Sequence, residues 1–223
     1  KTASPSLFSF LRIHLVGVKG VAMTSLAQCL TDLGKTITGS DVAQDFVTKD
    51  ILAALPLTIY TGFLPEHISD SVDMVIYTGA HQGRNNPEVL EAKAKNIPCM
   101  THAQALGQLM DTKRGISVCG TGGKSTTSAM IAWILTYAQM SPSFSVGVGN
   151  IPSIGTTGQY AATSEFFVAE ADEYAVDPTS DHRPRFIYQH PAVVVCPNLS
   201  YDHPDIYPDF ETMKKTFASF FAQ

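Results

Sequence analysis

The sequence has no long uncharged apolar run and no excess of basic residues. None of its apolar stretches reaches the roughly 20 residues that a membrane-spanning helix needs. The chain of 223 residues carries 15 Lys and Arg against 20 Asp and Glu, which gives a net charge of −5. An acidic balance argues against non-specific binding to nucleic acid or to anionic membrane surfaces. We therefore expect neither nucleic acid nor a membrane among the partners of the protein.

Cysteine is scarce, and its spacing is not that of a disulfide framework. The four cysteines include no C-x-x-C pair, and each lies in or beside an apolar segment: Cys29, Cys99, Cys119 and Cys196. Disulfide-rich domains and structural zinc sites need closer, regular spacings. The sequence therefore predicts buried free thiols and a reducing, cytoplasmic setting.

The strict dinucleotide fingerprint is missing near the N-terminus. Gly17 and Gly20 follow an apolar segment, residues 11–18, that reads as a strand. Lys19 and Ala22 break the G-x-G-x-x-G pattern of nicotinamide-binding folds. This departure argues against a dinucleotide oxidoreductase and favours a nucleotide of another kind.

The strict phosphate-loop pattern is incomplete as well, but its last part, Gly123-Lys124-Ser125, is present. Val118 replaces the first glycine of G-x-x-x-x-G-K-[ST], and a glycine-rich turn still joins the strand 115–119 to a helical pattern, residues 128–139. Backbone N–H groups at such a turn bind phosphate oxygens, and the helix dipole favours negative charge. Lys124 would reach the β- and γ-phosphates, and the Ser125 hydroxyl would bind Mg²⁺. The sequence therefore predicts an ATP site with these residues: Gly120, Thr121, Gly122, Gly123, Lys124, Ser125 and Thr126.

Apolar runs of strand and helix length alternate along the whole chain. We expect strands at residues 11–18, 35–39, 57–60, 73–78, 97–100, 115–119, 143–147, 165–169 and 192–196, with helices at 21–33, 87–95, 101–110, 128–139 and 209–221. Such alternation predicts an α/β protein with parallel sheets and helices on both faces. A short charged segment, residues 111–114, marks the domain boundary and divides a Rossmann-like domain, 1–111, from a phosphate-loop domain, 112–223. On the helix after the phosphate loop, Ile131, Trp133 and Leu135 are expected to pack in the core.

Ligands of parallel sheets bind beyond the carboxyl ends of the strands. The loops at Gly17, Asp41 and Thr78 should all lie at that edge of the first sheet. For Asp41 two interpretations are equally supported: it binds a ribose hydroxyl, or it caps a helix near Gln44.

Acidic residues and a histidine follow two strands of the second domain. Glu170 ends the strand 165–169 and begins an acidic cluster, and His203 follows the strand 192–196. Carboxylates at a strand end near a phosphate loop suit Mg²⁺, and His203 at the same edge is a candidate metal or phosphate ligand. The spacing of His81, His182 and His190 matches no zinc pattern, so we interpret them as loop histidines.

The ordered set of motifs resembles the Mur ligases, the ATP-dependent amide-forming enzymes of peptidoglycan synthesis. The matching pieces cover nearly the whole chain: His14-Leu15-Val16-Gly17-x-x-Gly20 with Met23, Gly39-Ser40-Asp41, Asn86-Pro87-Glu88, Gly120-Thr121-x-Gly123-Lys124-Ser125-Thr126-Thr127, Glu170-Ala171-Asp172-Glu173 and Asn198-Leu199-x-x-Asp202-His203-x-Asp205. The first part resembles the UDP-N-acetylmuramate domain of the L-alanine-adding type and of the type that recycles murein tripeptide. Gly122 and His102 depart from the family's usual residues at these positions, a His and, in the alanine-adding type, an Arg. The resemblance therefore leaves the acceptor, L-alanine or the tripeptide, open.

The resemblance implies a ligase that activates a carboxylate with ATP and Mg²⁺. Its implied catalytic residues are Lys124, Glu170 and His203, with Ser125, Glu170 and His203 at the metal. Its implied UDP-sugar residues are Gly17, Lys19, Gly20, Met23, Asp41, Thr78 and Asn86. Family members also have a longer central domain and a third domain, so we expect an N-terminal part of a longer ligase that is inactive alone.

Two other function classes are open to the same residues. A partitioning ATPase also carries G-K-S-T, but it has an extra lysine early in its loop, where Cys119 stands here. A UDP-sugar and ATP-binding protein without turnover is the second alternative.

Overall fold

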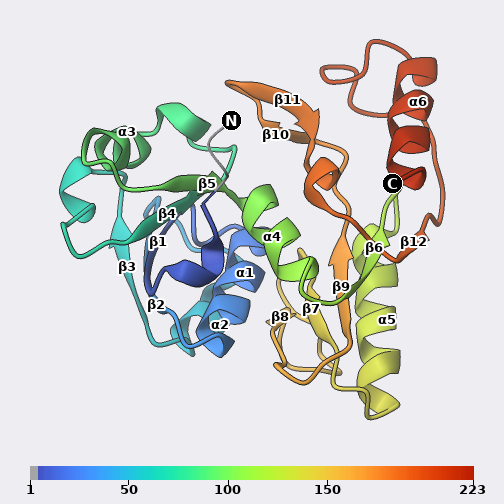
Figure 1. Ribbon diagram of the computed structural model, residues 1–223, viewed down its shortest axis with the longest axis horizontal. Helices are drawn as coiled ribbons and strands as arrows, with labels where there is room; N and C mark the ends of the chain where they lie inside the picture. The colour runs from blue at the N-terminus through green and yellow to red at the C-terminus, as the bar shows by residue number, and fades with distance from the viewer. Residues whose placement is uncertain (1–4) are drawn as a thin grey trace.

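The computed structural model describes residues 5–223 and contains two five-stranded sheets with helices packed against them (Figure 1). In the first sheet the strand order is β3-β2-β1-β4-β5, and every neighbouring pair is parallel. This half consists of η1 Leu7–Ser9, β1 Arg12–Val16, α1 Val21–Asp32, β2 Thr36–Asp41, α2 Lys49–Ala53, β3 Leu57–Thr61, η2 Pro65–His67, β4 Met74–Tyr77, η3 Gly83–Asn85, α3 Pro87–Ala94, β5 Cys99–Thr101 and α4 His102–Met110.

The strand order of the first sheet reverses between β1 and β4, which is where open parallel sheets bind ligands. Gly17 begins the turn after β1 at φ +83°, and a Cβ there would lie 2.5 Å from Cγ2 of Thr78 after β4. Only glycine combines this left-handed backbone with so close an approach. The prediction that the loops at Gly17, Asp41 and Thr78 share one edge is confirmed, because β1, β2 and β4 are parallel and end there.

The second sheet has the order β12-β6-β9-β7-β8. Its neighbouring pairs are parallel except β7 and β8, which are antiparallel. A separate two-stranded hairpin, β10-β11, stands beside it. This half consists of β6 Arg114–Val118, α5 Lys124–Tyr137, β7 Ser143–Ser145, β8 Gly158–Gln159, β9 Phe166–Glu170, β10 Ala175–Asp177, β11 Asp181–Pro184, η4 Arg185–Tyr188, β12 Val193–Val195 and α6 Phe210–Phe221.

The starts of several helices follow local sequence rules. Thr101 and Gln104 form the reciprocal capping box of α4, at the start of the helix expected over residues 101–110. Asn86 caps α3 by accepting a hydrogen bond from the Glu88 amide, with Pro87 in the first turn. These caps fix where each helix leaves the sheet edge.

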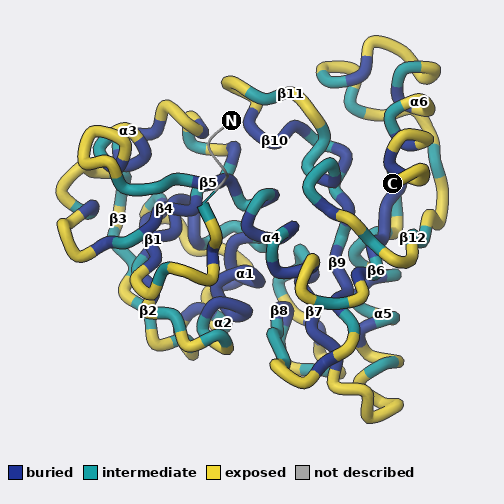
Figure 2. The backbone as a smooth tube through the Cα atoms, viewed as in Figure 1, coloured by how far each residue is buried: buried dark blue, intermediate teal, exposed yellow. Residues whose placement is uncertain are grey.

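Helix α1 lies between the two sheets and belongs to the core of both halves (Figures 1 and 2). Leu26 and Leu30 of α1 are fully buried in one cluster with Phe167 and Ala169 of β9. In Figure 2 the buried backbone runs from β1 through α1 to β9. The two sheets therefore share a continuous apolar core rather than touching only at their surfaces.

Helix α5 differs from the expectation in the residue at which it begins and in which of its side chains pack against the core. It begins at Lys124 rather than at Ser128, because Gly123 at φ +78° turns the chain directly into the first helical turn. The prediction of a buried Trp133 is wrong: its side chain is 42% exposed and stacks on Tyr137. The neighbours on the other face, Ile131 and Leu135, do pack against the core.

Other expectations also need correction. All four cysteines are free, and Cys29 and Cys119 are buried as predicted, but Cys196 is exposed. His182 lies in β11 rather than in a loop. The sequence did not predict α2, β8 or the β10-β11 hairpin. Within residues 5–223, no helix is both long enough and apolar enough to cross a membrane.

Candidate active site

The glycine-rich turn after β6 adopts the backbone of a phosphate-binding loop. Gly120 has φ +112°, and a Cβ there would collide with the carbonyl oxygen of Asn198. Gly123 has φ +78° and is the N-cap of α5, so Lys124 is the first helical residue. The predicted ATP-binding residues 120–126 thus lie where a strand end meets a helix N-terminus, an arrangement that favours anions.

The segment after β12 closes over this loop. The Gly122 amide donates to Asn198 Oδ1 at 2.9 Å, and Asn198 Nδ2 donates back to the Gly122 carbonyl at 3.0 Å. Thr121 Oγ1 donates to the Ser200 carbonyl at 2.7 Å and lies 3.0 Å from the Ser200 amide. The loop therefore has a fixed shape without a ligand.

Lys124 binds a buried carboxylate that the sequence reading did not assign. Its Nζ lies 2.9 and 2.8 Å from the two oxygens of Glu173 and donates to the Gly120 carbonyl at 2.8 Å. Glu173 is 1% exposed, and Nε2 of His203 lies 3.4 Å from the same Oε1. Lys124 and His203, predicted to act together, are thus joined through Glu173.

Glu170 stands at the end of β9, beside the start of α5. Ser125 Oγ donates to its Oε2 at 3.0 Å, and the Gly147 amide donates to its Oε1 at 2.6 Å. Burial raises the pKa of Glu170, and these two hydrogen bonds act in the opposite direction. Two of the three predicted metal ligands, Ser125 and Glu170, are therefore in direct contact.

The donor set suits a hard divalent cation. A hydroxyl and a carboxylate oxygen beside a phosphate loop are the ligands that Mg²⁺ prefers, because it keeps waters and phosphate oxygens as its other partners. Across residues 5–223, no group of three or more His, Cys, Asp and Glu side chains is arranged to hold a metal by itself. A metal here would therefore depend on ligands from a bound phosphate as well.

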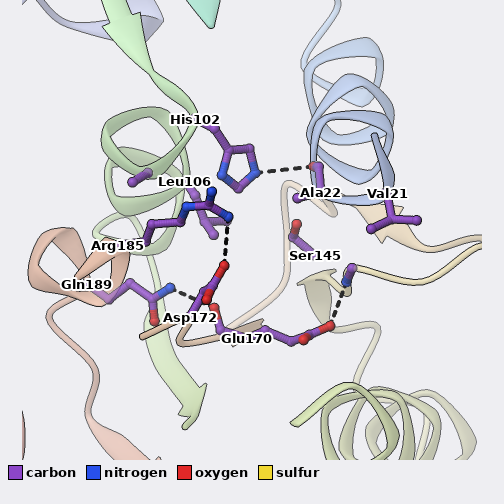
Figure 3. A pocket seen from close by; sticks show the side chains of 11 residues that line it. Val21, Ala22, His102, Leu106, Ser145, Glu170, Asp172, Arg185 and Gln189 are labelled. Atoms are coloured by element: carbon purple, nitrogen blue, oxygen red, sulfur yellow. Dashed lines mark hydrogen bonds and ion pairs between the residues drawn. The ribbon is translucent and has the colours of Figure 1, made fainter. Parts of the chain in front are cut away.

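A pocket of about 170 Å³ opens between the two halves, next to Glu170 (Figure 3). His102 of α4 and Arg185 both line it, and Nε2 of His102 donates to the Ala22 carbonyl at 3.2 Å. Burial, together with the nearby Arg185 guanidinium, lowers the pKa of His102 to about 4. Arg185 donates to Asp172 Oδ2 at 2.7 Å. The pocket thus offers a neutral imidazole and a partly paired guanidinium to a ligand that reaches from α1 toward Glu170.

The predicted UDP-sugar residues differ in where the structure places them. Gly17, Gly20 and Thr78 line the turns at the switch point, with Gly20 as the N-cap of α1. Asn86 is 1% exposed, and its side chain caps α3 and donates to the His81 carbonyl. Met23 is different, because it is 2% exposed and packs in the hydrophobic core.

Asp41 and Lys19 join the loop after β2 to the turn after β1. Oδ2 of Asp41 accepts the Lys19 amide at 2.7 Å, and Asp41 is 1% exposed. The alternative of a helix cap near Gln44 is wrong, because residues 42–47 form no helix. Nζ of Lys19 donates to the carbonyls of Val42 and Gln44 at 2.7 and 2.9 Å. Binding of the UDP-sugar by the Lys19 side chain stays a prediction, and it requires the ammonium group to leave these carbonyls.

The sequence offered partial signals for the residues it missed. Glu173 and Asn198 stood inside motifs that were recognised, but no contact partner could be read for them. Arg185 lies in the stretch 171–190, where neither helical nor strand periodicity is present.

Comparisons with known proteins agree with this geometry. The description "Mur ligase family, catalytic domain" matches residues 12–114, and "Mur ligase middle domain" matches residues 118–223. The chain belongs to the Mur ligase family. The two matches meet between α4 and the phosphate loop.

Named relatives come from several bacteria. A UDP-N-acetylmuramate–L-alanine ligase from Ralstonia nicotianae is 38% identical over 209 residues, covering 93% of this chain and 41% of the relative. The Aquifex aeolicus protein of the same name is 36% identical, covering 94% of this chain and 43% of the relative. The chain thus spans less than half the length of these curated relatives.

Solved structures share the fold. The UDP-N-acetylmuramate:L-alanyl-γ-D-glutamyl-meso-diaminopimelate ligase from Neisseria meningitides superposes with a TM-score of 0.85 at 28% identity, covering 95% of this chain and 67% of that one. The UDP-N-acetylmuramate–alanine ligase from Thermotoga maritima superposes with a TM-score of 0.81 at 24% identity, covering 94% of this chain and 46% of that one. The predicted Mur ligase architecture, with a Rossmann-like half followed by a phosphate-loop half, is confirmed.

Proposed function

We propose that the protein carrying this chain is an ATP-dependent ligase of peptidoglycan synthesis. It joins L-alanine to the lactyl carboxylate of UDP-N-acetylmuramate through an acyl phosphate. The observation that carries this proposal is the convergence of Lys124, Glu173 and His203 on one side of the phosphate loop and of Ser125 and Glu170 on the other. The names of the relatives from Ralstonia and Aquifex support the substrate pair.

The proposed reaction has two steps. A lactyl carboxylate oxygen attacks the γ-phosphorus of ATP, the bond to the β–γ bridging oxygen breaks, and ADP leaves. The neutral amine of alanine then attacks the acyl carbon, inorganic phosphate leaves, and the amine proton passes to solvent. Positioning and charge neutralisation dominate such phosphoryl transfer. The ammonium of Lys124 would offset charge on the transferring group.

The chain's residues fit both proposed cofactors. The loop 120–126 and the start of α5 would hold the ATP phosphates, and Ser125 with Glu170 would hold Mg²⁺, with His203 as the third predicted ligand. When bound, Mg²⁺ neutralises phosphate charge. The UDP-sugar would lie along the switch point at Gly17 and Thr78, with its lactyl end directed into the pocket of His102 and Arg185.

A second acceptor is favoured by one comparison. The Neisseria structure, named for ligation of a tripeptide, superposes on 95% of this chain with a TM-score of 0.85. In a protein of the relatives' length that carries this chain, phosphate release with ATP and UDP-N-acetylmuramate separates the two functions. Stimulation by L-alanine alone supports the main proposal, and stimulation by the tripeptide alone assigns the recycling reaction.

Lys124→Ala in that protein tests the role of the phosphate loop. We expect turnover to fall by roughly 10²–10⁴, the range typical of losing a preorganised charge contact. Lys113→Ala, a lysine between the two halves and away from the loop, is the matched control and should keep turnover. Near wild-type turnover of Lys124→Ala would refute the assignment. Calorimetric titration of this chain with UDP-N-acetylmuramate tests the substrate site separately.

A further inference from the structure

The loop that follows β4, residues 79–84, has an unfavourable backbone. Three consecutive residues have left-handed conformations: His81 at φ 51°, Gln82 at φ 70° and Gly83 at φ 50°. Two of them carry a Cβ, which makes this region sterically costly. Such a conformation persists only where the surroundings hold it, and it is most often found at ligand sites.

The surroundings that hold this loop come from the other half of the molecule. Asp177, at the end of β10, is 1% exposed, and its Oδ2 accepts the Arg84 amide at 2.9 Å. Its Oδ1 accepts the amide and hydroxyl of Thr179 at 2.9 and 2.7 Å, and Ser180 Oγ donates to Oδ2 at 2.8 Å. The carboxylate is thus oriented by its own hairpin and directed at the loop.

Two glycines allow the hairpin to approach this closely. A Cβ on Gly79 would lie 2.7 Å from the Val176 carbonyl oxygen, and a Cβ on Gly83 would lie 2.6 Å from Cγ of Asp177. Real Cβ atoms do not come so near, so any larger side chain at either position would push the hairpin tip away. The loop and the hairpin tip therefore fit as one unit.

The same loop reaches the residues of the switch point. The imidazole of His81 packs on Phe63 with ring centroids 4.7 Å apart, and its Nε2 lies 3.6 Å from Oδ1 of Asp41. The other oxygen of Asp41 accepts the Lys19 amide in the turn after β1. Contacts thus run from Asp177 through the strained loop to both turns that frame the predicted UDP-sugar site.

We propose that Asp177 is a positioning residue of the UDP-sugar site. It keeps residues 81–83 of this loop in their left-handed conformation, so the phosphate-loop half completes the sugar site of the Rossmann-like half. This inference rests on the proposed function, because it takes the switch point to be the UDP-sugar site.

The test compares Asp177→Ala, Asp177→Asn and the control Asp181→Ala, whose carboxylate accepts hydrogen bonds from Arg183 of the same hairpin. By calorimetry, Asp177→Ala should weaken UDP-N-acetylmuramate binding by about tenfold, equal to about 1.4 kcal/mol. Asp177→Asn should lose less, because its amide oxygen still accepts the Arg84 N–H. Asp181→Ala should bind as wild type. Unchanged affinity in Asp177→Ala, or an equal loss of ATP·Mg²⁺ affinity, would overturn the proposal.

A second arm needs no ligand, so it distinguishes failure of this inference from failure of the proposed function. Hydrogen–deuterium exchange of residues 79–86 should become faster in Asp177→Ala and stay unchanged in Asp181→Ala. Equal exchange in both variants would contradict the proposal that Asp177 holds this loop. Gly83→Ala should quicken exchange as well. Because its Cβ collides with the Asp177 carboxylate, the effect should be smaller when Asp177 is already Ala, and strict additivity would contradict the contact. If the wild-type chain binds no UDP-sugar but the exchange results are as expected, the proposed function is refuted, whereas the role of Asp177 in holding the loop is supported.

Discussion

Removing one member of the Lys124–Glu173 pair should destabilise the protein more than removing both. The Lys124 ammonium lies within 2.9 Å of both Glu173 oxygens, and the carboxylate is 1% exposed. Lys124→Met leaves that carboxylate in the interior without its main partner. The double variant Lys124→Met/Glu173→Gln removes both charges and keeps similar side-chain volumes.

The magnitude follows from burial on each side of the pair. Breaking a buried ion pair by deleting one partner costs about 3–5 kcal/mol, whereas replacing both partners is often neutral. We expect about 3 kcal/mol for Lys124→Met, because His203 remains 3.4 Å from Oε1 and the lysine side chain is 16% exposed. For a chain of this size, 3 kcal/mol lowers Tm by roughly 6–12 °C.

Urea unfolding of wild type, both single variants and the double variant at one pH gives the complete cycle. The double variant should lie within about 1 kcal/mol of wild type, with an interaction energy larger than the experimental error. If the two single losses simply add, Glu173 is not held by Lys124, and the reasoning that links the phosphate loop to this carboxylate is refuted.

Two further predictions concern His102 and Gly120. The pKa of His102 is lowered to about 4 in the folded chain, against about 6.5 when unfolded. The unfolded chain alone takes up a proton as the pH falls from 6.5 to 4, so stability should drop by at most about 1.4 kcal/mol per pH unit. In urea unfolding at pH 7 and pH 5, His102→Gln should lose less stability than wild type; an equal loss would contradict the shift. Gly120→Ala adds a collision with Asn198 to a positive φ, so it should abolish ATP binding in calorimetry. Gly155→Ala, with a positive φ in open space, should cost about 1 kcal/mol and keep ATP binding.

Local signals in the sequence predicted the elements that local rules decide. Gly17 was expected in a loop after a strand, and it lies there with a left-handed backbone. A helix was expected over residues 101–110, where Thr101 caps α4. The phosphate loop was recognised because its glycines and lysine are contiguous. None of these predictions needed knowledge of a distant part of the chain.

The contacts that depend on distant residues could not be predicted. Glu173 pairs with Lys124 across 49 positions, and Asp177 binds the Arg84 amide across 93. The helical period of α5 was clear, but periodicity alone did not show which face the sheet covers, so Trp133 was placed in the core. Strands β10 and β11 are too short to show an alternating pattern, and the Asp177 carboxylate holds the turn between them through Thr179 and Ser180.

Helix α1 connects the switch point of the first sheet to the second sheet. Its N-terminus faces the switch point, where Gly20 is the N-cap. Further along, Oε1 of Gln28 accepts the amides of Thr157 and Gly158, and Ser25 Oγ lies 2.7 Å from Ser145 Oγ of β7. The same helix thus begins at the switch-point turn after β1 and contacts the phosphate-loop sheet along its side. Because close-packed interiors transmit strain, we expect a change at the first turn of α1 to affect the strands beside Glu170. The contact of Asp177 with the Arg84 amide is a second link between the two halves.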